Sequence, residues 1–215
     1  MTGPGAAPGP ERFPGFSVLG QADHWDGATR AVVLARLEPP GPTRFFSRAE
    51  QATAVALVAR LVDVDRELAT SLVVEIDSRM ADDETDGWHY DDMPVDEEAW
   101  HRSLAGLDAE AAGRGADSFA DLTDEDAHAV LAAIADSKAD TWHGLPRNRT
   151  WDLWMRYSCT AYYAHPIAWD EMGWPGPAYP RGYKNTGIDS REPFEVRDTH
   201  PRWDPEADDR SKKDA

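Results

Sequence analysis

The chain has 215 residues, of which 41% are hydrophobic and 29% are charged, and this composition is typical of a globular protein. The length favours one compact domain with a hydrophobic core, so we expect a single domain with tails. The 40 acidic residues outnumber the 22 basic ones and give a formal net charge of −18. Such a surface repels the phosphates of nucleic acid and of anionic membranes, so we expect neither as a partner.

The sequence also limits the ways in which this chain could be targeted or carry electrons. No segment approaches the roughly 20 apolar residues that a membrane-spanning helix needs, so we expect no direct membrane insertion. Residues 1–14 lack a basic start, an apolar core and an Arg-Arg pair, so we see no signal peptide. Cys159 is the only cysteine, which excludes an intramolecular disulfide, a four-cysteine iron–sulfur cluster and a C-x-x-C-H haem attachment in this chain.

Residues 1–44 are interpreted as an N-terminal arm with a short apolar segment. Its Pro- and Gly-rich beginning cannot bury enough apolar area to offset the entropy of ordering. The apolar residues 31–37 could form a strand or a helix, and their length does not decide between them. Residues 39–42 (Pro-Pro-Gly-Pro) then end this segment.

Four helices are predicted between residues 45 and 136. The first begins at Ser47, which with Glu50 has the pattern of a capping box. The second is predicted from apolar residues that recur every four positions between residues 68 and 80. The third covers about residues 97–111. Thr123 is the predicted N-cap of the fourth, because acidic residues follow it in the first turn.

A fifth helix is predicted over about residues 149–164 and is unusually aromatic. Aromatic residues occupy more than one face of it, so we expect it to be buried on several sides. Residues 165 and 166 (His-Pro) end it. The predicted fold is mainly α: a single helical domain of about five helices at residues 45–166, an irregular aromatic- and Pro-rich segment at 167–205 and a disordered tail at 206–215.

The search for catalytic and cofactor motifs gives no assignment, and we expect no catalytic, cofactor-binding or metal-binding residues in this chain. The sequence contains no phosphate-binding Gly-x-x-x-x-Gly-Lys-Ser/Thr loop, no Gly-x-Ser-x-Gly nucleophile elbow and no His-Glu-x-x-His motif. Residues 82–87 imitate the first half of a calcium loop, but the position that should hold a bidentate carboxylate is Met93. We interpret this acidic loop as a solvated connector, and Cys159 as a small buried hydrophobic residue.

The strongest positive signal is the set of nine tryptophans. Those at positions 100, 151 and 154 lie in predicted helices, where packing in the core explains them. Others lie on irregular, Pro-rich segments, where the sequence does not decide whether they contact a partner or pack within the chain. The candidate partner interface therefore consists of aromatic residues and one neighbouring proline on these segments: Trp25, Trp169, Trp174, Pro175, Tyr179 and Trp203.

Four short patterns occur in a fixed order over residues 45–183. Residues 45–50 (Phe-Phe-Ser-Arg-Ala-Glu) open an Ala-rich helix, and residues 103–109 (Ser-Leu-Ala-Gly-Leu-Asp-Ala) lie in the middle. Residues 119–126 precede another helix, and residues 173–179 (Gly-Trp-Pro-Gly-Pro-Ala-Tyr) follow the aromatic helix. With these patterns the sequence resembles the gluconate 2-dehydrogenase subunit 3 family.

The resemblance implies a small helical partner of a larger FAD-dependent dehydrogenase of the glucose–methanol–choline type, which oxidises a sugar or sugar acid. The large subunit would hold FAD and the catalytic base, a separate cytochrome subunit can take the electrons, and this chain would support folding, stability or export. Family members often carry a twin-arginine signal, and this sequence departs from them by having none. The resemblance therefore implies a cytoplasmic complex, or one exported with a partner that carries the signal.

Two other functions remain open at the level of sequence. The chain could be a stand-alone enzyme that uses His and carboxylate groups, with or without a metal, on the acidic loop at residues 82–92. It could also be a helical module that binds a small ligand, with Trp151, Trp154, Tyr157 and Tyr162 lining a pocket. Turnover without a partner would favour the enzyme, and sugar binding by a monomeric, folded chain would favour the module.

Overall fold

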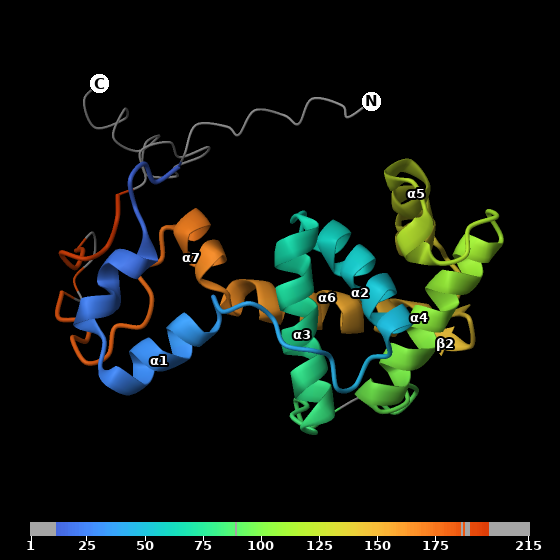
Figure 1. Ribbon diagram of the computed structural model, residues 1–215, viewed down its shortest axis with the longest axis horizontal. Coiled ribbons are helices and arrows are strands. Elements are labelled where there is room, and N and C mark those ends of the chain that lie inside the picture. The colour runs from blue at the N-terminus through green and yellow to red at the C-terminus, as the bar shows by residue number, and fades with distance from the viewer. Residues whose placement is uncertain (1–11, 89, 186, 188–189, 198–215) are drawn as a thin grey trace. The chain divides into compact units, whose positions relative to one another are not determined.

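The computed structural model describes residues 12–88, 90–185, 187 and 190–197. Within these ranges, seven α-helices and two 3-10 helices provide almost all of the regular structure, beside one two-stranded antiparallel sheet (Figure 1). The prediction of a mainly helical fold is confirmed. The number of helices exceeds the predicted five, because further helices form in the segments before residue 45 and after residue 165.

The chain divides into two compact units. The larger unit is residues 39–164, and the smaller unit combines residues 1–38 with residues 165–215. The larger unit has 25 acidic and 11 basic residues, a charge of −14, which leaves −4 of the total of −18 for the smaller unit. The predicted boundaries at residues 44, 166 and 205 stay a prediction, and the predicted tail at 206–215 lies outside the described residues.

The five longer helices of the larger unit begin near the positions that local sequence signals indicate. They are α2 (Arg48–Leu61), α3 (Arg66–Ala81), α4 (Asp96–Ala112), α5 (Asp124–Asp136) and α6 (Arg147–Ala164). The predicted capping box is present at α2, where Ser47 accepts a hydrogen bond from the Glu50 N–H and Glu50 accepts one from the Ser47 N–H. The predicted cap Thr123 accepts from the Asp126 N–H at the start of α5.

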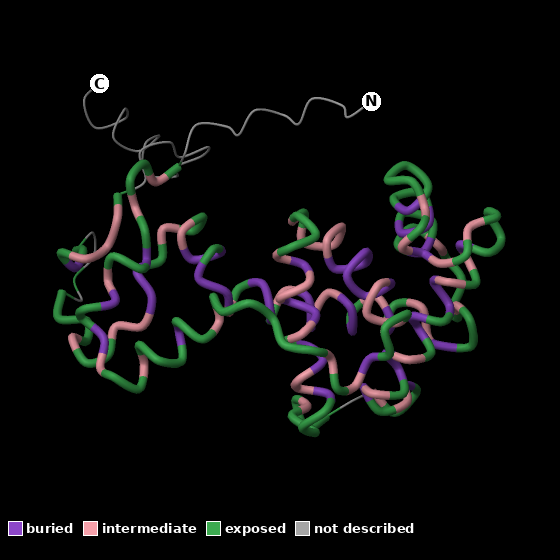
Figure 2. The backbone as a smooth tube through the Cα atoms, in the orientation of Figure 1, coloured by how far each residue is buried: buried purple, intermediate pink, exposed green. Residues whose placement is uncertain are grey.

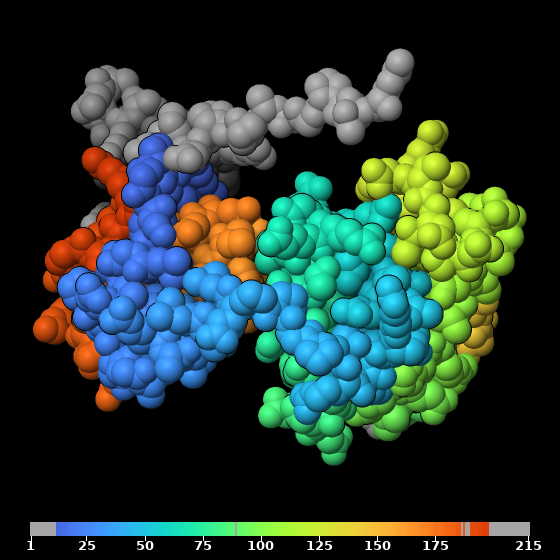
Figure 3. Space-filling model, in the orientation of Figure 1, coloured from blue at the N-terminus to red at the C-terminus, as the bar shows by residue number. Residues whose placement is uncertain are grey.

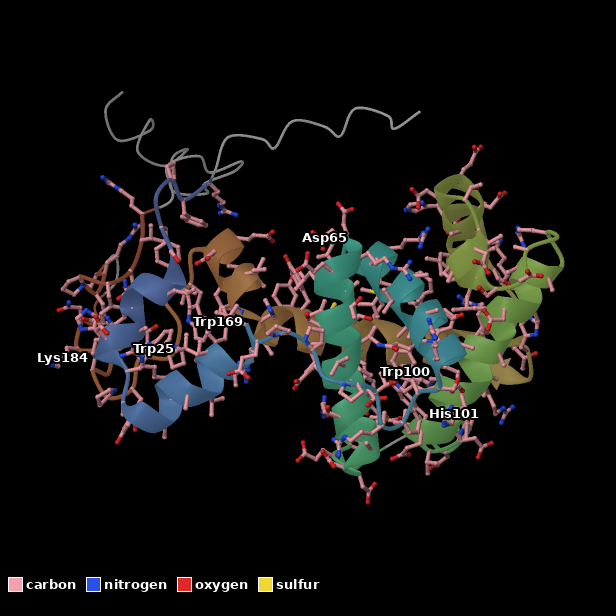
Figure 4. The ribbon with its side chains drawn as sticks, viewed as in Figure 1. Trp25, Asp65, Trp100, His101, Trp169 and Lys184 are labelled. Atoms are coloured by element: carbon pink, nitrogen blue, oxygen red, sulfur yellow. The ribbon has the colours of Figure 1, made fainter. Side chains whose placement is uncertain are left out.

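Helix α6 lies at the centre of this unit and contacts α2, α3, α4 and α5. This arrangement confirms that the aromatic helix is buried on several sides. Trp154 and Tyr157 of α6 and Trp100 of α4 are completely buried, and Trp100 is labelled in Figure 4. Buried and exposed stretches alternate along the helices, as one-sided packing requires (Figure 2).

Short elements complete the larger unit between α4 and α6. The 3-10 helix η2 (Phe119–Asp121) packs on α2 and α4, and Phe119 is fully buried. Strands β1 (Thr141–Trp142) and β2 (Leu145–Pro146) form a hairpin in which Trp142 pairs with Leu145. The hairpin leads directly into α6.

The smaller unit is formed by segments from both ends of the chain. It contains the 3-10 helix η1 (Val18–His24), α1 (Gly27–Ala35) and α7 (Pro166–Met172). Helix α7 packs on η1, and the Val18 N–H donates to the Asp170 carboxylate over 2.5 Å. The two segments share one surface of this unit, blue for the N-terminal and orange to red for the C-terminal residues (Figure 3). Most of the apolar residues 31–37, left open between strand and helix, lie in α1.

Candidate partner interface

The smaller unit has its own core, and this core contains three of the six residues of the predicted interface. Trp25 and Trp169 are buried, and both are labelled in Figure 4. Pro175 is also buried. A methyl group on the adjoining Gly176 would come within 2.8 Å of the Trp25 ring, so the turn at residues 173–177 lies directly against this core.

Two other predicted residues lie at the surface of the smaller unit. Trp174 packs edge-on against Trp169, with 4.6 Å between the ring centroids, yet 37% of its surface is exposed. Tyr179 is 64% exposed. Trp203 lies outside the described residues. Trp174 and Tyr179 are thus accessible at the surface, and the interface role of all six residues stays a prediction.

The smaller unit exposes further large apolar side chains beside Trp174 and Tyr179. Twelve large hydrophobic residues are exposed on the described part of the chain, and nine of them belong to this unit although it is the shorter of the two. Apolar side chains gathered at a protein surface are typical of sites of protein–protein contact. The nine residues are Leu19, Val32, Leu34, Leu37, Ile167, Met172, Trp174, Tyr179 and Tyr183.

Helical periodicity could have indicated part of this surface. Residues 32–34 are three consecutive aliphatic residues, and a helix turns by about 100° per residue. If these residues form a helix, only some of them can face a core. In α1 the core receives Val33, which is 2% exposed, whereas Val32 is 57% exposed. The missing information was that residues 31–35 are helical.

His165 fixes the start of α7 and separates it from α6. Its Nδ1 accepts a hydrogen bond from the Ile167 N–H over 3.3 Å, and Pro166 occupies the first turn, where no backbone donor is needed. Burial lowers the pKa of His165 and outweighs the hydrogen bond with the Arg36 backbone, which acts to raise it, while the positive charge of Arg36 also lowers it. The ring is therefore neutral at neutral pH, which is the state in which a ring nitrogen can accept this hydrogen bond.

The comparison with known families covers most of the helical part of the chain. Residues 48–176 match the family model described as gluconate 2-dehydrogenase subunit 3. The chain belongs to the gluconate 2-dehydrogenase subunit 3 family. This result confirms the resemblance seen in the sequence. No curated protein and no solved structure gave a match.

In this subunit 3 family member, the acidic loop after α3 is held by arginines. Asp82 accepts from Arg44 over 2.7 Å, and this hydrogen bond lowers the pKa of Asp82. Burial alone would raise the pKa of Asp86, but Arg79 and Arg156 outweigh it and lower the pKa. Among the residues that the structure describes, no three His, Cys, Asp or Glu side chains are grouped so as to hold a metal ion.

Trp154 and Tyr157, two of the four aromatic residues proposed for a ligand pocket, lie in the hydrophobic core. Trp154 is fully buried, and its indole N–H donates to the Ser103 hydroxyl over 3.0 Å. Tyr157 is also buried and donates to the Asp96 carboxylate over 2.6 Å. Burial and the Asp96 carboxylate raise the pKa of Tyr157, so it stays protonated and keeps donating. No helix in the described part of this subunit 3 family member is long and apolar enough to cross a membrane.

Proposed function

We propose that this chain is a non-catalytic accessory subunit that binds and stabilises a larger FAD-dependent dehydrogenase of the glucose–methanol–choline type. Membership of the gluconate 2-dehydrogenase subunit 3 family supports a role in such a complex. The observation that carries the binding role is the concentration of exposed apolar side chains in the smaller unit. Burying them against a partner would remove apolar surface from water.

In this proposal the flavoprotein performs the oxidation of a sugar or sugar acid and holds the FAD. A cytochrome subunit can accept the electrons. The present chain contributes a folded surface, and because it would bind only the native flavoprotein, it would shift the folding equilibrium of that subunit toward the native state. Exposed aromatic residues such as Trp174 and Tyr179 would contribute much of the binding free energy.

Co-expression of this chain with the flavoprotein from the same source tests the proposal. The two proteins are expected to co-purify, and Tyr179→Ala is expected to weaken the complex roughly 30-fold, which corresponds to about 2 kcal/mol for a good aromatic contact. Tyr163→Ala is the matched control, because Tyr163 is an exposed tyrosine of the larger unit. Failure of the wild-type pair to associate, or tightly bound flavin in the isolated chain, would overturn the proposal.

A further inference from the structure

A cavity of about 170 Å³ lies in the larger unit, between the segment that leads into α4 and the first three turns of α6. Its walls include two aromatic rings, Trp88 and Tyr90, which meet edge-on with 5.2 Å between their centroids. Met93, Leu153 and Met155 add apolar surface. An engineered apolar cavity of about 150 Å³ accommodates benzene, so this space is large enough for one aromatic ring.

Two of the charged groups that line the cavity already satisfy each other. Arg156 donates to the buried Asp96 carboxylate over 3.0 Å and also pairs with Asp86. Asp96 accepts a second hydrogen bond from the Tyr157 hydroxyl. Asp96 and Arg156 therefore stabilise the wall of the cavity and leave little charge for a ligand.

Arg149 is in a different situation. Its guanidinium lies 3.5 Å from the centroid of the Tyr90 ring, so one face of the planar group is used for stacking. Its Nε is buried and has no hydrogen-bond partner among the described residues. The nearest carboxylate, Asp92, is 3.8 Å from this Nε and is mostly exposed. The buried Nε is closed to a ligand, so donation to a carboxylate in the plane of the guanidinium falls to the terminal N–H groups, which form no hydrogen bond with another described residue.

We propose that this cavity binds a small carboxylic acid that carries a single aromatic ring. The ring packs against Trp88, Tyr90 and the two methionines, and the carboxylate accepts from Arg149. Asp152 also lines the cavity and Asp92 lies beside Arg149, and both repel an anion. Both are largely exposed, so water weakens this repulsion more than it weakens a hydrogen bond to the partly buried guanidinium.

Benzoate is the probe for this proposal, used with the full chain and with nitrogen-15 NMR of the arginine side chains. Benzoate is expected to shift the Arg149 Nε–H signal and to bind more tightly than acetate, which lacks the ring, or benzyl alcohol, which lacks the charge. Arg149→Gln is expected to weaken binding about tenfold or more, as the loss of a charge-assisted hydrogen bond implies. Arg48→Gln, which changes an exposed arginine at the start of α2, is the control and should leave binding unchanged.

Asp92→Asn separates a binding role of Arg149 from a structural one. Removal of the competing carboxylate is expected to tighten benzoate binding several-fold, and a loss of fold cannot produce such a gain. Circular dichroism of each variant shows whether it is folded. No Arg149 shift with millimolar benzoate, equal affinity in folded Arg149→Gln, or weaker binding in Asp92→Asn would overturn the proposal. The site lies in the larger unit and does not depend on the proposed accessory function.

Discussion

Asp77 of α3 is a fully buried carboxylate that orders the segment before α2. It accepts backbone N–H groups from three consecutive residues, Arg44 at 2.7 Å, Phe45 at 2.9 Å and Phe46 at 2.7 Å. A buried carboxylate is tolerated only when donors of this kind satisfy it. These bonds fix the chain just before the capping box at Ser47.

Asp77→Asn is expected to destabilise the protein by about 3 kcal/mol. The amide nitrogen that replaces one carboxylate oxygen cannot accept, so at least one charge-assisted hydrogen bond is lost and a backbone N–H is left unpaired. The midpoint of urea unfolding measures this change. Asp83→Asn is the control, because Asp83 is exposed and its positive φ of 56° is one that asparagine also adopts. Equal midpoints for the two variants would contradict this role of Asp77.

At the scale of elements, the turn after α7 shows why glycine is required at one position and only preferred at another. Gly176 and Gly182 both have positive φ values, 75° and 68°. A Cβ on Gly176 would lie 2.8 Å from the Trp25 ring and 3.0 Å from Val18, whereas a Cβ on Gly182 would meet nothing within 4 Å. Backbone strain is common to both positions, and steric overlap occurs only at Gly176.

Gly176→Ala is therefore expected to destabilise the smaller unit by roughly 1–3 kcal/mol more than Gly182→Ala, the usual cost of overpacking. Hydrogen exchange of the backbone amides in α1 and α7 measures the local effect. The amides of α3, in the larger unit, serve as an internal reference. Equal loss of protection in the two variants would show that the close approach to Trp25 has no energetic effect.

At the scale of the whole molecule, the dominant feature is the concentration of negative charge in the larger unit, −14 of the total of −18. Its surface ion pairs, such as Arg44 with Asp82 and Arg102 with Glu98, are largely exposed, so water screens them and each contributes little to stability. Salt weakens these pairs, but it also screens the much more numerous repulsions. The repulsion is expected to dominate the salt dependence.

The free energy of unfolding is accordingly expected to rise when NaCl is added up to physiological ionic strength, where the Debye length falls to about 8 Å. Urea unfolding at several NaCl concentrations measures how steeply the free energy of unfolding rises with salt. Glu125→Lys reverses a charge at an exposed position of α5 and so reduces the net negative charge. The free energy of unfolding of this variant should rise less steeply with salt. A stability that falls with added salt would mean that the ion pairs outweigh the repulsion.

The sequence by itself determined the features that depend on neighbouring residues. The helical class, the capping box at Ser47, the cap at Thr123 and the end of the aromatic helix before Pro166 all follow from interactions within about four residues. The ordered patterns over residues 45–183 were also sufficient to indicate the family that the comparison then identified.

Only the tertiary structure decided which aromatic residues are buried and which are exposed. The local sequence did not distinguish Trp25 and Trp169 from Trp174, and all three were interface candidates. Trp25 and Trp169 are nevertheless buried in the smaller unit, because segments from both ends of the chain pack together there. Arg149 likewise acquires its stacked position only because α6 lies beside the loop that carries Tyr90. Burial and stacking depend on the partners that folding brings near, and no local pattern specifies partners that are distant in the sequence.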